Sequence, residues 1–269
     1  MTTTHAPLPS FETIALTRTD RLLTITLNRP DALNGVNEQM HRDLIDVLAF
    51  VTDDAASDVV MLTGAGRAFS AGGDFAYMAE NAKHPERFDS DVRRAKRIVF
   101  ALLDLEKPVV CKLNGHAVGL GATIALLCDV IFAAENAKIG DPHVSIGLVA
   151  GDGGAVVWPL RVGFARAKEY LLTGDLIPAP KAEQIGLINH CVPAAELDAT
   201  ADAFCQRLLA GSSNAIRWTK VAVNLELKRI AHAVMDAGIA YEAVTVRSDD
   251  HREAVAALQE KRTPVFKRP

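Results

Sequence analysis

The chain has 269 residues, of which 49% are hydrophobic and 23% are charged, and its formal net charge at pH 7 is −4. A chain of this length and composition can bury a sizeable core in one large domain, with or without an appendage. The small net charge, with both signs scattered, excludes nucleic acid as the main partner, and no uncharged apolar run is long enough to span a membrane.

The first half of the chain alternates short strands and helices. Apolar runs over residues 13–17 and 22–27 flank a polar turn and predict a hairpin. Asn37 is a typical N-cap residue, and the apolar stripe that follows it predicts a helix. A strand predicted over residues 59–63 leads into a glycine-rich turn, and residues 74–85 are predicted as a mobile loop. A second helix is predicted to end before Pro108.

The second half repeats the same alternation and then becomes helical. A strand over residues 109–113, a second glycine-rich turn, a helix over 120–128 and a strand over 129–133 are predicted, followed by short helices over 163–172 and 181–185. The recurring strand–turn–helix unit is typical of a superhelix of ββα turns. A shift in composition near Pro193 divides the chain into a core, residues 1–193, and a C-terminal helical region, residues 194–269, with a break near Gly211.

The two glycine-rich turns, residues 69–74 and 114–121, are the main functional signal. Glycine tolerates positive φ and leaves amide N–H groups free to face a ligand. Two such amides that converge on one carbonyl oxygen form an oxyanion hole, which points to carbonyl chemistry without a metal or redox cofactor. Neither turn completes the GxSxG or GxGxxG motif, so a serine hydrolase and a dinucleotide-binding oxidoreductase are disfavoured.

Taken in order, the motifs resemble those of the crotonase superfamily, the enoyl-CoA hydratase/isomerase family. The resemblance is carried by residues 27–34, 66–74, 114–129, 172–189 and 253–266, and so spans nearly the whole chain. It implies an α/β fold with a crotonase-like ββα superhelix core and a C-terminal helical trimerisation region. It also implies that a thioester of coenzyme A is the ligand, as part of the substrate and without a separate cofactor.

The resemblance carries binding roles onto named positions. It places the two oxyanion amides on Ala71 and Leu120, and Leu120 begins a predicted helix, where free N–H groups favour negative charge. The segment that is expected along the coenzyme A comprises Ala32, Leu33, Ala71, Gly72, Gly73 and Asp74. Glycine is expected to be required at Gly72 and Gly121, where a side chain would crowd the ligand.

The departures from the family pattern concern proton transfer. Where hydratases of the family carry two glutamates, this chain has Thr123 and His143. Threonine does not ionise near neutral pH, so Thr123 either holds a water or substrate group or bonds its own helix. His143, with an unperturbed pKa of about 6.5, suits acid–base work, and the alternative is a packed histidine. Asp152 is either a helix N-cap or an active-site carboxylate, although relatives that use an aspartate in this turn place it at the position of Gly151.

These observations predict an acyl-CoA-processing enzyme, a lyase or isomerase that stabilises an enolate and moves protons through His143, with Asp152 as a further candidate. A single acid–base group favours double-bond isomerisation over hydration. Hydrolysis of a thioester or a carbon–carbon bond by an activated water stays open. The alternative from another class is a non-catalytic acyl-CoA-binding homologue that has lost its catalytic carboxylates.

Other expectations concern the surroundings of the site. Residues 75–97 and Trp158 are predicted to form the floor of the acyl pocket. The other histidines, His41 and His251 among them, show no metal-ligand spacing and are expected in solvated or capping roles, so no metal is expected.

The compartment and the assembly are predicted from cysteine usage and from the C-terminal helices. The four cysteines show no disulfide pattern, and the first ten residues lack the apolar segment of a signal peptide, so a cytoplasmic protein is expected. A homotrimer or a dimer of trimers is expected, with the helices beyond Glu196 at the interface and Trp218 available for burial.

Overall fold

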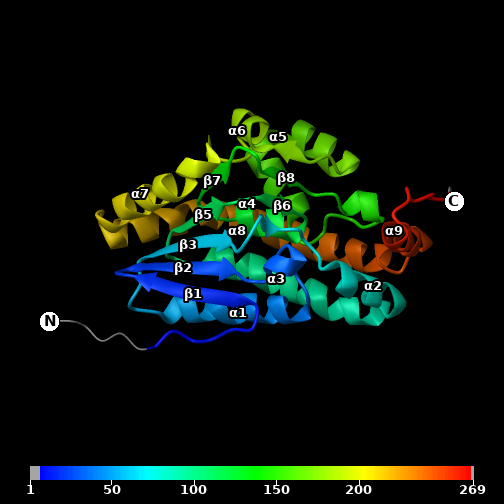
Figure 1. Cartoon of the computed structure of the whole chain (residues 1–269), viewed down its shortest axis with the longest axis horizontal. Helices are drawn as coiled ribbons and strands as arrows, with labels where there is room; N and C mark the ends of the chain where they lie inside the picture. Colours follow the sequence, from blue (N-terminus) through cyan, green and yellow to red (C-terminus); the bar gives the residue numbers. More distant parts are fainter. Residues whose placement is uncertain (1–6, 268–269) are drawn as a thin grey trace.

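The computed structural model describes residues 7–267 and consists of two sheets with helices packed around them (Figure 1). The larger sheet has the strand order β1-β2-β3-β5-β7-β10, and the smaller one has the order β4-β6-β8-β9. Strands β1 and β2 form the predicted antiparallel hairpin, and the remaining pairs of the larger sheet are parallel. The strands are β1 (Ile14–Thr19), β2 (Leu22–Leu27), β3 (Val59–Gly64), β4 (Ala68–Ser70), β5 (Val109–Leu113), β6 (His116–Val118), β7 (Val130–Ala134), β8 (Lys138–Gly140), β9 (Ile177–Pro178) and β10 (His190–Val192).

The architecture repeats a ββα unit, as the sequence predicts. Each of β3, β5 and β7 lies in the larger sheet and is followed at once by a short strand, β4, β6 or β8, in the smaller sheet. Because β4, β6 and β8 pair in parallel, the segments that leave their carboxyl ends meet along one edge. The two glycine-rich turns begin at this edge, and this brings them together.

The longer helices form a layer beside the larger sheet and continue into the C-terminal region. The helix α1 begins where predicted, because the Asn37 side chain accepts a hydrogen bond from the Met40 N–H at 2.9 Å. It packs on α3, which in turn packs on α8. The helices are α1 (Glu38–Asp53), α2 (Phe75–Lys83), α3 (Phe88–Asp104), α4 (Leu120–Leu126), α5 (Gly154–Thr173), α6 (Ala179–Gln184), α7 (Leu197–Leu209), α8 (Ser213–Thr245) and α9 (Asp249–Gln259).

One prediction about local structure is wrong. The segment predicted as a mobile loop over residues 74–85 contains α2, because the Asp74 carboxylate caps its N-terminus by accepting from the Tyr77 N–H at 2.9 Å. The helix predicted over 163–172 is present as the second half of α5, and the non-helical backbone of Gly163, with φ +77° and ψ 160°, separates it from the first half. The strands of the smaller sheet were not predicted, because each is only two or three residues long.

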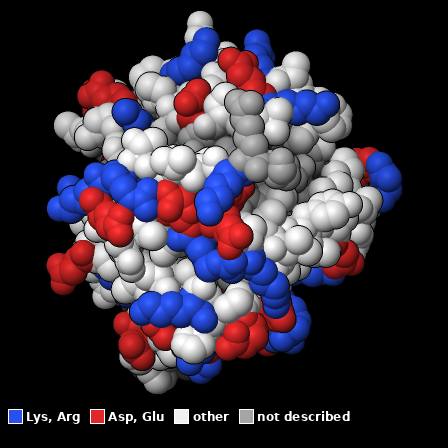
Figure 2. Space-filling model, turned by 90° about the vertical axis from the view of Figure 1, so that its right-hand side faces the viewer, with Lys and Arg blue, Asp and Glu red and all other residues white. Residues whose placement is uncertain are grey.

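After β10 every regular element that the structure describes is a helix. The helix α8 packs on α3 and α5, and α9 lies beside α2 at the right-hand end of the molecule in Figure 1. On that end of the molecule, positive and negative side chains are interspersed (Figure 2). None of the helices within residues 7–267 combines the length and apolarity of a membrane span.

Candidate active site

A cavity of about 220 Å³ opens where the smaller sheet, α2, α3 and the C-terminal helices meet. Its lining includes the turn after β4, the turn after β6 and the segment after β8, which share one sheet edge. The rest of the wall comes from α1, α2, α3, α8 and α9. The cavity therefore lies where the sequence predicts the oxyanion amides, but it also draws on the C-terminal helical region.

The amide N–H groups in the two turns are not all free. The N–H of Ala71 donates to the Leu33 carbonyl at 2.9 Å, so the prediction that Ala71 supplies an oxyanion amide is wrong for this structure. The N–H of Gly73 has no hydrogen-bond partner among residues 7–267, and Gly73 lines the cavity. Leu120 is the first residue of α4, whose N-terminal N–H groups lack intrahelical partners, and it lines the cavity as well. Gly73 and Leu120 are thus the two available donors.

Close packing between the turns explains one of the predicted glycine requirements. Gly72 has a φ of +83°, and a Cβ added there would lie 2.7 Å from the Val118 carbonyl oxygen. A side chain at Gly121 would not crowd a ligand as expected, because Gly121 does not line the cavity. Glycine is needed there for another reason, since a Cβ would meet the Ser70 side chain at 2.6 Å. Gly72 therefore fixes the distance between the two turns, whereas Gly121 serves packing behind them.

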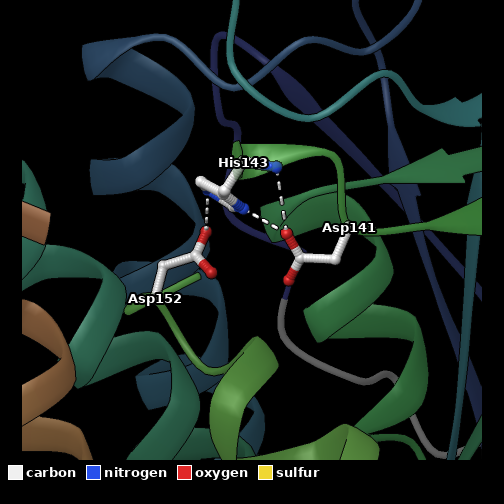
Figure 3. A group of neighbouring side chains, drawn as sticks. All are labelled: Asp141, His143 and Asp152. Atoms are coloured by element: carbon white, nitrogen blue, oxygen red, sulfur yellow. Dashed lines mark hydrogen bonds and ion pairs between the residues drawn. The ribbon is translucent and has the colours of Figure 1, made fainter. Parts of the chain in front are cut away.

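His143 lies beside the second turn, between two carboxylates (Figure 3). Its Nδ1 contacts the Asp141 carboxylate, and its Nε2 lies 3.4 Å from the Asp152 Oδ2. A Cβ added to Gly119 would lie 3.4 Å from the His143 Cε1, which places the ring next to the start of α4. Burial opposes a charge on the ring, but the two carboxylates, Asp141 first, outweigh it and raise the pKa of His143 well above its usual value. The charged imidazolium is therefore favoured.

Asp152 lines the cavity and does not cap a helix. It is 5% exposed, and α5 begins only at Gly154, after the N-cap residue Gly153. The N-cap alternative for Asp152 is therefore wrong. The Asp152 Oδ1 is buried without a hydrogen-bond partner among the described residues. Asp152 thus keeps one oxygen facing the His143 ring and one oxygen unsatisfied, which is unusual for a buried carboxylate with a purely structural role.

Glu242 of α8 is a third carboxyl group near the His143 ring, and no local pattern in the sequence indicates it. Its Oε1 lies 3.9 Å from the His143 Nε2, its Oε2 is buried without a partner among residues 7–267, and the side chain lines the cavity. Burial, reinforced by repulsion from Asp152, raises the pKa of Glu242 well above its usual range, so the neutral form is favoured. A Cβ at Gly151 would lie 2.8 Å from the Glu242 Oε2. The Glu242 side chain of α8 therefore lies in the space that a side chain at position 151 would need.

Thr123 and Trp158 lie outside the cavity lining. Thr123 is fully buried in α4, with its methyl group against Gly153 and its hydroxyl without a partner among the described residues. Trp158 is a fully buried core residue. By contrast, α2 and the first half of α3 contribute several lining residues, in the range predicted for the acyl pocket. Thr123 thus has no access to a ligand in this cavity.

The remaining predicted coenzyme A contacts are divided between the cavity and the turn next to it. Ala71, Gly72, Gly73 and Leu120 line the cavity, but Ala32, Leu33 and Asp74 do not. Leu33 follows a short 3₁₀ turn with a φ of +51° and holds the first glycine turn through its carbonyl. Asp74 caps α2 and pairs with Arg29 at 2.9 Å. Leu33 and Asp74 therefore act on the turn from outside the cavity.

Two histidines that were expected in solvated or capping roles are buried in the cavity wall. His41 is 7% exposed, and its Nδ1 lies 3.1 Å from the Asn37 carbonyl. His251 is 2% exposed, and its Nδ1 lies 2.7 Å from the Ile146 carbonyl. Burial lowers the pKa of both rings, which favours their neutral forms. Periodicity could have placed His41 on the buried face of α1, but only the fold brings His251 to the cavity.

Asp141, His143 and Asp152 also meet the geometric condition for a metal site, since one ligand atom of each lies within 4.8 Å of the others. The ring nitrogens of His143 face different carboxylates, Nδ1 toward Asp141 and Nε2 toward Asp152. One ion binds only one nitrogen of a ring, whereas a protonated ring satisfies both carboxylates at once. The three residues therefore form a protonated histidine paired with two carboxylates.

Comparison with known proteins agrees with the architecture. The family model described as enoyl-CoA hydratase/isomerase matches residues 17–269. A probable enoyl-CoA hydratase, echA8, of Mycobacterium bovis is 34% identical over 265 residues, which cover 96% of this chain and 98% of that protein. The 1,2-epoxyphenylacetyl-CoA isomerase of Escherichia coli K12 is 34% identical over 247 residues, covering 91% of this chain and 94% of that protein.

A solved structure of an enoyl-CoA hydratase/isomerase from Mycobacterium paratuberculosis superposes with a TM-score of 0.88 at 39% identity, covering 92% of this chain and 99% of that one. The predicted fold class, an α/β molecule with a crotonase-like core, is thereby confirmed. The extent of these matches shows that the chain belongs to the enoyl-CoA hydratase/isomerase family.

Proposed function

We propose that the chain acts on an acyl-CoA thioester and shifts a carbon–carbon double bond within the acyl group. The observation that supports this most is the buried pair of His143 and Asp152 beside two available amide donors, in a cavity where neither family glutamate position holds a glutamate. A double-bond shift needs one group that removes a proton from one carbon and returns it to another. The Asp152 carboxylate is suited to this role.

The charge of each group in the site determines the role that we propose for it. The N–H groups of Gly73 and Leu120 would bind the thioester oxygen and stabilise the negative charge that develops on it. The Asp152 carboxylate would take the proton from the carbon next to the carbonyl and deliver it two carbons further along. Because His143 favours its charged form, it is an acid in the resting site and holds Asp152 in position. Proton transfer, for which the sequence favours His143 and offers Asp152 as a further candidate, is therefore proposed for the pair.

Hydrolytic cleavage is a second candidate, and one observation favours it. Glu242 adds a second acid–base group, held toward its neutral form, near the Nε2 of His143. A carboxylate base can remove a proton from a water as the water adds to a carbonyl, while a neutral carboxylic acid donates a proton. A single base supplies only the first of these two proton transfers. The non-catalytic alternative is disfavoured, because its premise was a pocket without carboxylates, whereas this cavity holds Asp152 and Glu242.

The test is to incubate the purified protein with 3-enoyl-CoA thioesters and β-keto acyl-CoA thioesters and to identify the products by mass spectrometry and NMR. Formation of the conjugated 2-enoyl thioester from the first group supports isomerisation. Release of free acid or of a shortened acyl group supports hydrolysis. The Asp152→Asn protein should lose either activity, and Asp249→Asn, at a position that is 84% exposed in its side chain, is the control. Binding without any turnover would contradict the catalytic proposal.

We also propose that the chain forms a homotrimer or a dimer of trimers through its C-terminal helices. The helix α8 leaves large apolar side chains exposed, among them Trp218 at 64%, Val223 at 64% and Tyr241 at 64%. Exposed apolar side chains along one long helix are costly unless a partner covers them.

A further inference from the structure

Asp141 is a buried carboxylate that the proposed reaction does not use. It follows β8 directly, is 1% exposed and does not line the cavity, so it does not contact a ligand held there. Its Oδ1 contacts the His143 Nδ1 and also accepts from the His143 backbone N–H at 3.5 Å (Figure 3). Pro142, whose ring restricts φ, is the only residue between them. Asp141 and His143 are thus held together by a short, stiff segment.

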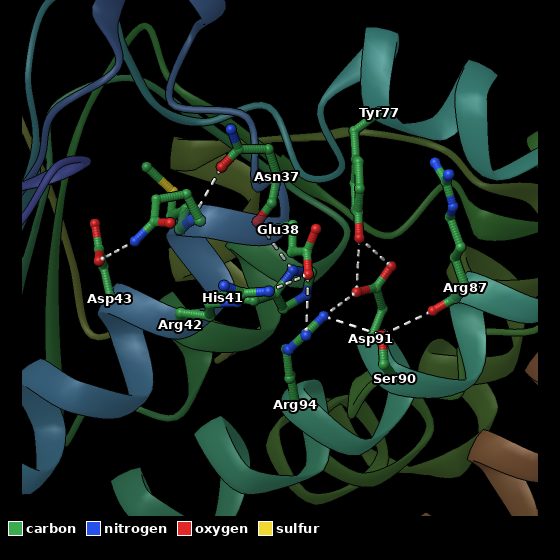
Figure 4. A network of polar contacts seen from close by, with 12 residues as sticks. Asn37, Glu38, His41, Arg42, Asp43, Tyr77, Arg87, Ser90, Asp91 and Arg94 are labelled. Atoms are coloured by element: carbon green, nitrogen blue, oxygen red, sulfur yellow. Dashed lines mark hydrogen bonds and ion pairs between the residues drawn. The ribbon is translucent and has the colours of Figure 1, made fainter.

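Asp91 of α3, another buried carboxylate near the cavity, is paired with a permanent cation. The Tyr77 hydroxyl lies 2.8 Å from both of its oxygens, and the Arg94 Nη1 donates at 2.9 Å. Figure 4 shows Tyr77 and Arg94 pointing at this carboxylate from two sides. Asp141 has no such partner, since its only ion pair among residues 7–267 is with His143. The charge of Asp91 is thus balanced by arginine, whereas the charge of Asp141 acts on the His143 ring.

The second oxygen of Asp141 lies against Gly154, the first residue of α5. A Cβ added to Gly154 would lie 1.9 Å from the Asp141 Oδ2, so a side chain at position 154 would displace the carboxylate. This Oδ2 is buried without a hydrogen-bond partner among the described residues. An unsatisfied buried acceptor costs free energy and calls for an explanation, and the contact of the Oδ1 with the His143 ring supplies one.

The other groups that face His143 come from three further segments. Asp152, before α5, and Glu242 of α8 lie 3.4 Å and 3.9 Å from the Nε2. The pKa of His251 on α9 is lowered by burial and also by the charge of His143. Burial lowers the pKa of His143 itself, and Asp141 is the largest of the influences that raise it. Because Glu242 favours its neutral form, removing the charge of Asp141 leaves Asp152 alone against burial.

The effect of the ring on Asp152 depends on the hydrogen at the Nε2. With the Nδ1–H held by Asp141, a charged ring presents its second hydrogen to Asp152, whereas a neutral ring would present a lone pair and repel the carboxylate. Resting on the proposed role of Asp152, we propose that Asp141 is a positioning residue that acts through His143. It orients the Nε2–H toward Asp152 and so holds the Asp152 carboxylate in place as the base. The site then requires Asp141 and His143 as a unit.

The test measures the His143 ring and the reaction separately in Asp141→Asn, which keeps the shape of the side chain and removes its charge. An NMR titration of the His143 ring should give a midpoint about one to three pH units lower than in the wild type. Deuterium exchange at the carbon next to the carbonyl of a saturated acyl-CoA should then fall about tenfold for each pH unit above that midpoint, while the wild type keeps its rate over the same range. Asp249→Asn, at an exposed position of α9, should match the wild type in both measurements.

Gly154→Ala is a second variant, in which Asp141 keeps its charge. The added Cβ would move the Asp141 carboxylate away from its place beside the ring, and neither Gly154 nor Asp141 lines the cavity. A lower His143 midpoint and an exchange rate that falls with pH are therefore expected here too. Gly154→Ala keeps the inference testable if Asp141→Asn does not fold.

The possible outcomes are separable. A His143 midpoint in folded Asp141→Asn that equals the wild-type value would overturn the inference and leave the proposed function intact. An exchange rate that is reduced by the same factor at every pH would overturn it as well, because a structural defect alone has that effect. If the wild-type protein binds the thioester but catalyses no exchange, the proposed function is wrong and the positioning role fails with it. That result is recognised without any variant.

Discussion

The two glycine turns lie close together at Gly72, so we can predict how much Gly72→Ala lowers the free energy of unfolding. Gly72 has a φ of +83°, and an added Cβ would lie 2.7 Å from the Val118 oxygen and 3.2 Å from the Val118 carbonyl carbon. The left-handed backbone costs a non-glycine residue about 1–2 kcal/mol, and forcing extra volume into packed backbone costs about 1–3 kcal/mol. We therefore expect Gly72→Ala to lower the free energy of unfolding by about 2–5 kcal/mol.

Gly186 provides a matched control. Its φ is +79°, but a Cβ there would meet only the Arg161 carbonyl oxygen at 3.9 Å, an ordinary contact, so Gly186→Ala should carry only the backbone cost of about 1–2 kcal/mol. Urea unfolding gives both values. Calorimetry with a saturated acyl-CoA should show binding lost in Gly72→Ala, since the Gly73 and Leu120 amides are pushed apart, and retained in Gly186→Ala. Equal stabilities and equal affinities for the two variants would refute the reasoning.

Three further predictions follow from the carboxyl groups, the buried threonine and the C-terminal helices. His143→Ala should lower turnover by about a hundred- to ten-thousand-fold at unchanged ligand affinity, whereas Thr123→Ala, outside the cavity lining, should retain most turnover in steady-state assays. The pKa of Glu242 is higher in the folded protein than in the unfolded chain, where it is about 4.3. The neutral carboxyl therefore stabilises the fold fully below about pH 4.3, and this stabilisation is lost as the pH rises through the folded pKa. Melting temperatures of the wild type should therefore fall relative to those of Glu242→Gln over that pH range, and a difference in melting temperature that does not change with pH would contradict the raised pKa. Light scattering at micromolar concentration should give a trimer or hexamer, and a monomer would contradict the use of Trp218 and its neighbours as an interface.

The sequence predicts that the two glycine turns follow strands and lie close together, because local rules decide both features. Glycine turns after apolar strands are visible at short range, and parallel strands bring their carboxyl ends to the same edge. The error at Ala71 comes from a hydrogen bond to Leu33, a contact between segments 38 residues apart in number, which no local pattern specifies. Similarly, Asp74 could have been recognised as a helix cap, but the mixed polarity after it favoured a loop.

The acid–base groups were predicted only in part, for the same reason. His143 and Asp152 are close in sequence, so their proximity is a local property of the turn before α5. Glu242 and His251 reach the cavity only because α8 crosses Gly151 and α9 follows it back toward α2. Their role depends on how the C-terminal helices pack, and an amphipathic pattern does not reveal which polar residue of a long helix faces a cavity.

The central claim is that the pair of His143 and Asp152 moves a proton at the carbon next to the thioester carbonyl. The most direct test is deuterium exchange at that carbon of a saturated acyl-CoA in heavy water, followed by mass spectrometry. The wild-type protein should catalyse exchange, and Asp152→Asn should slow it by about a hundred- to ten-thousand-fold while binding the same thioester. Exchange at the wild-type rate in Asp152→Asn, or no exchange in wild-type protein that binds the thioester, would contradict the claim.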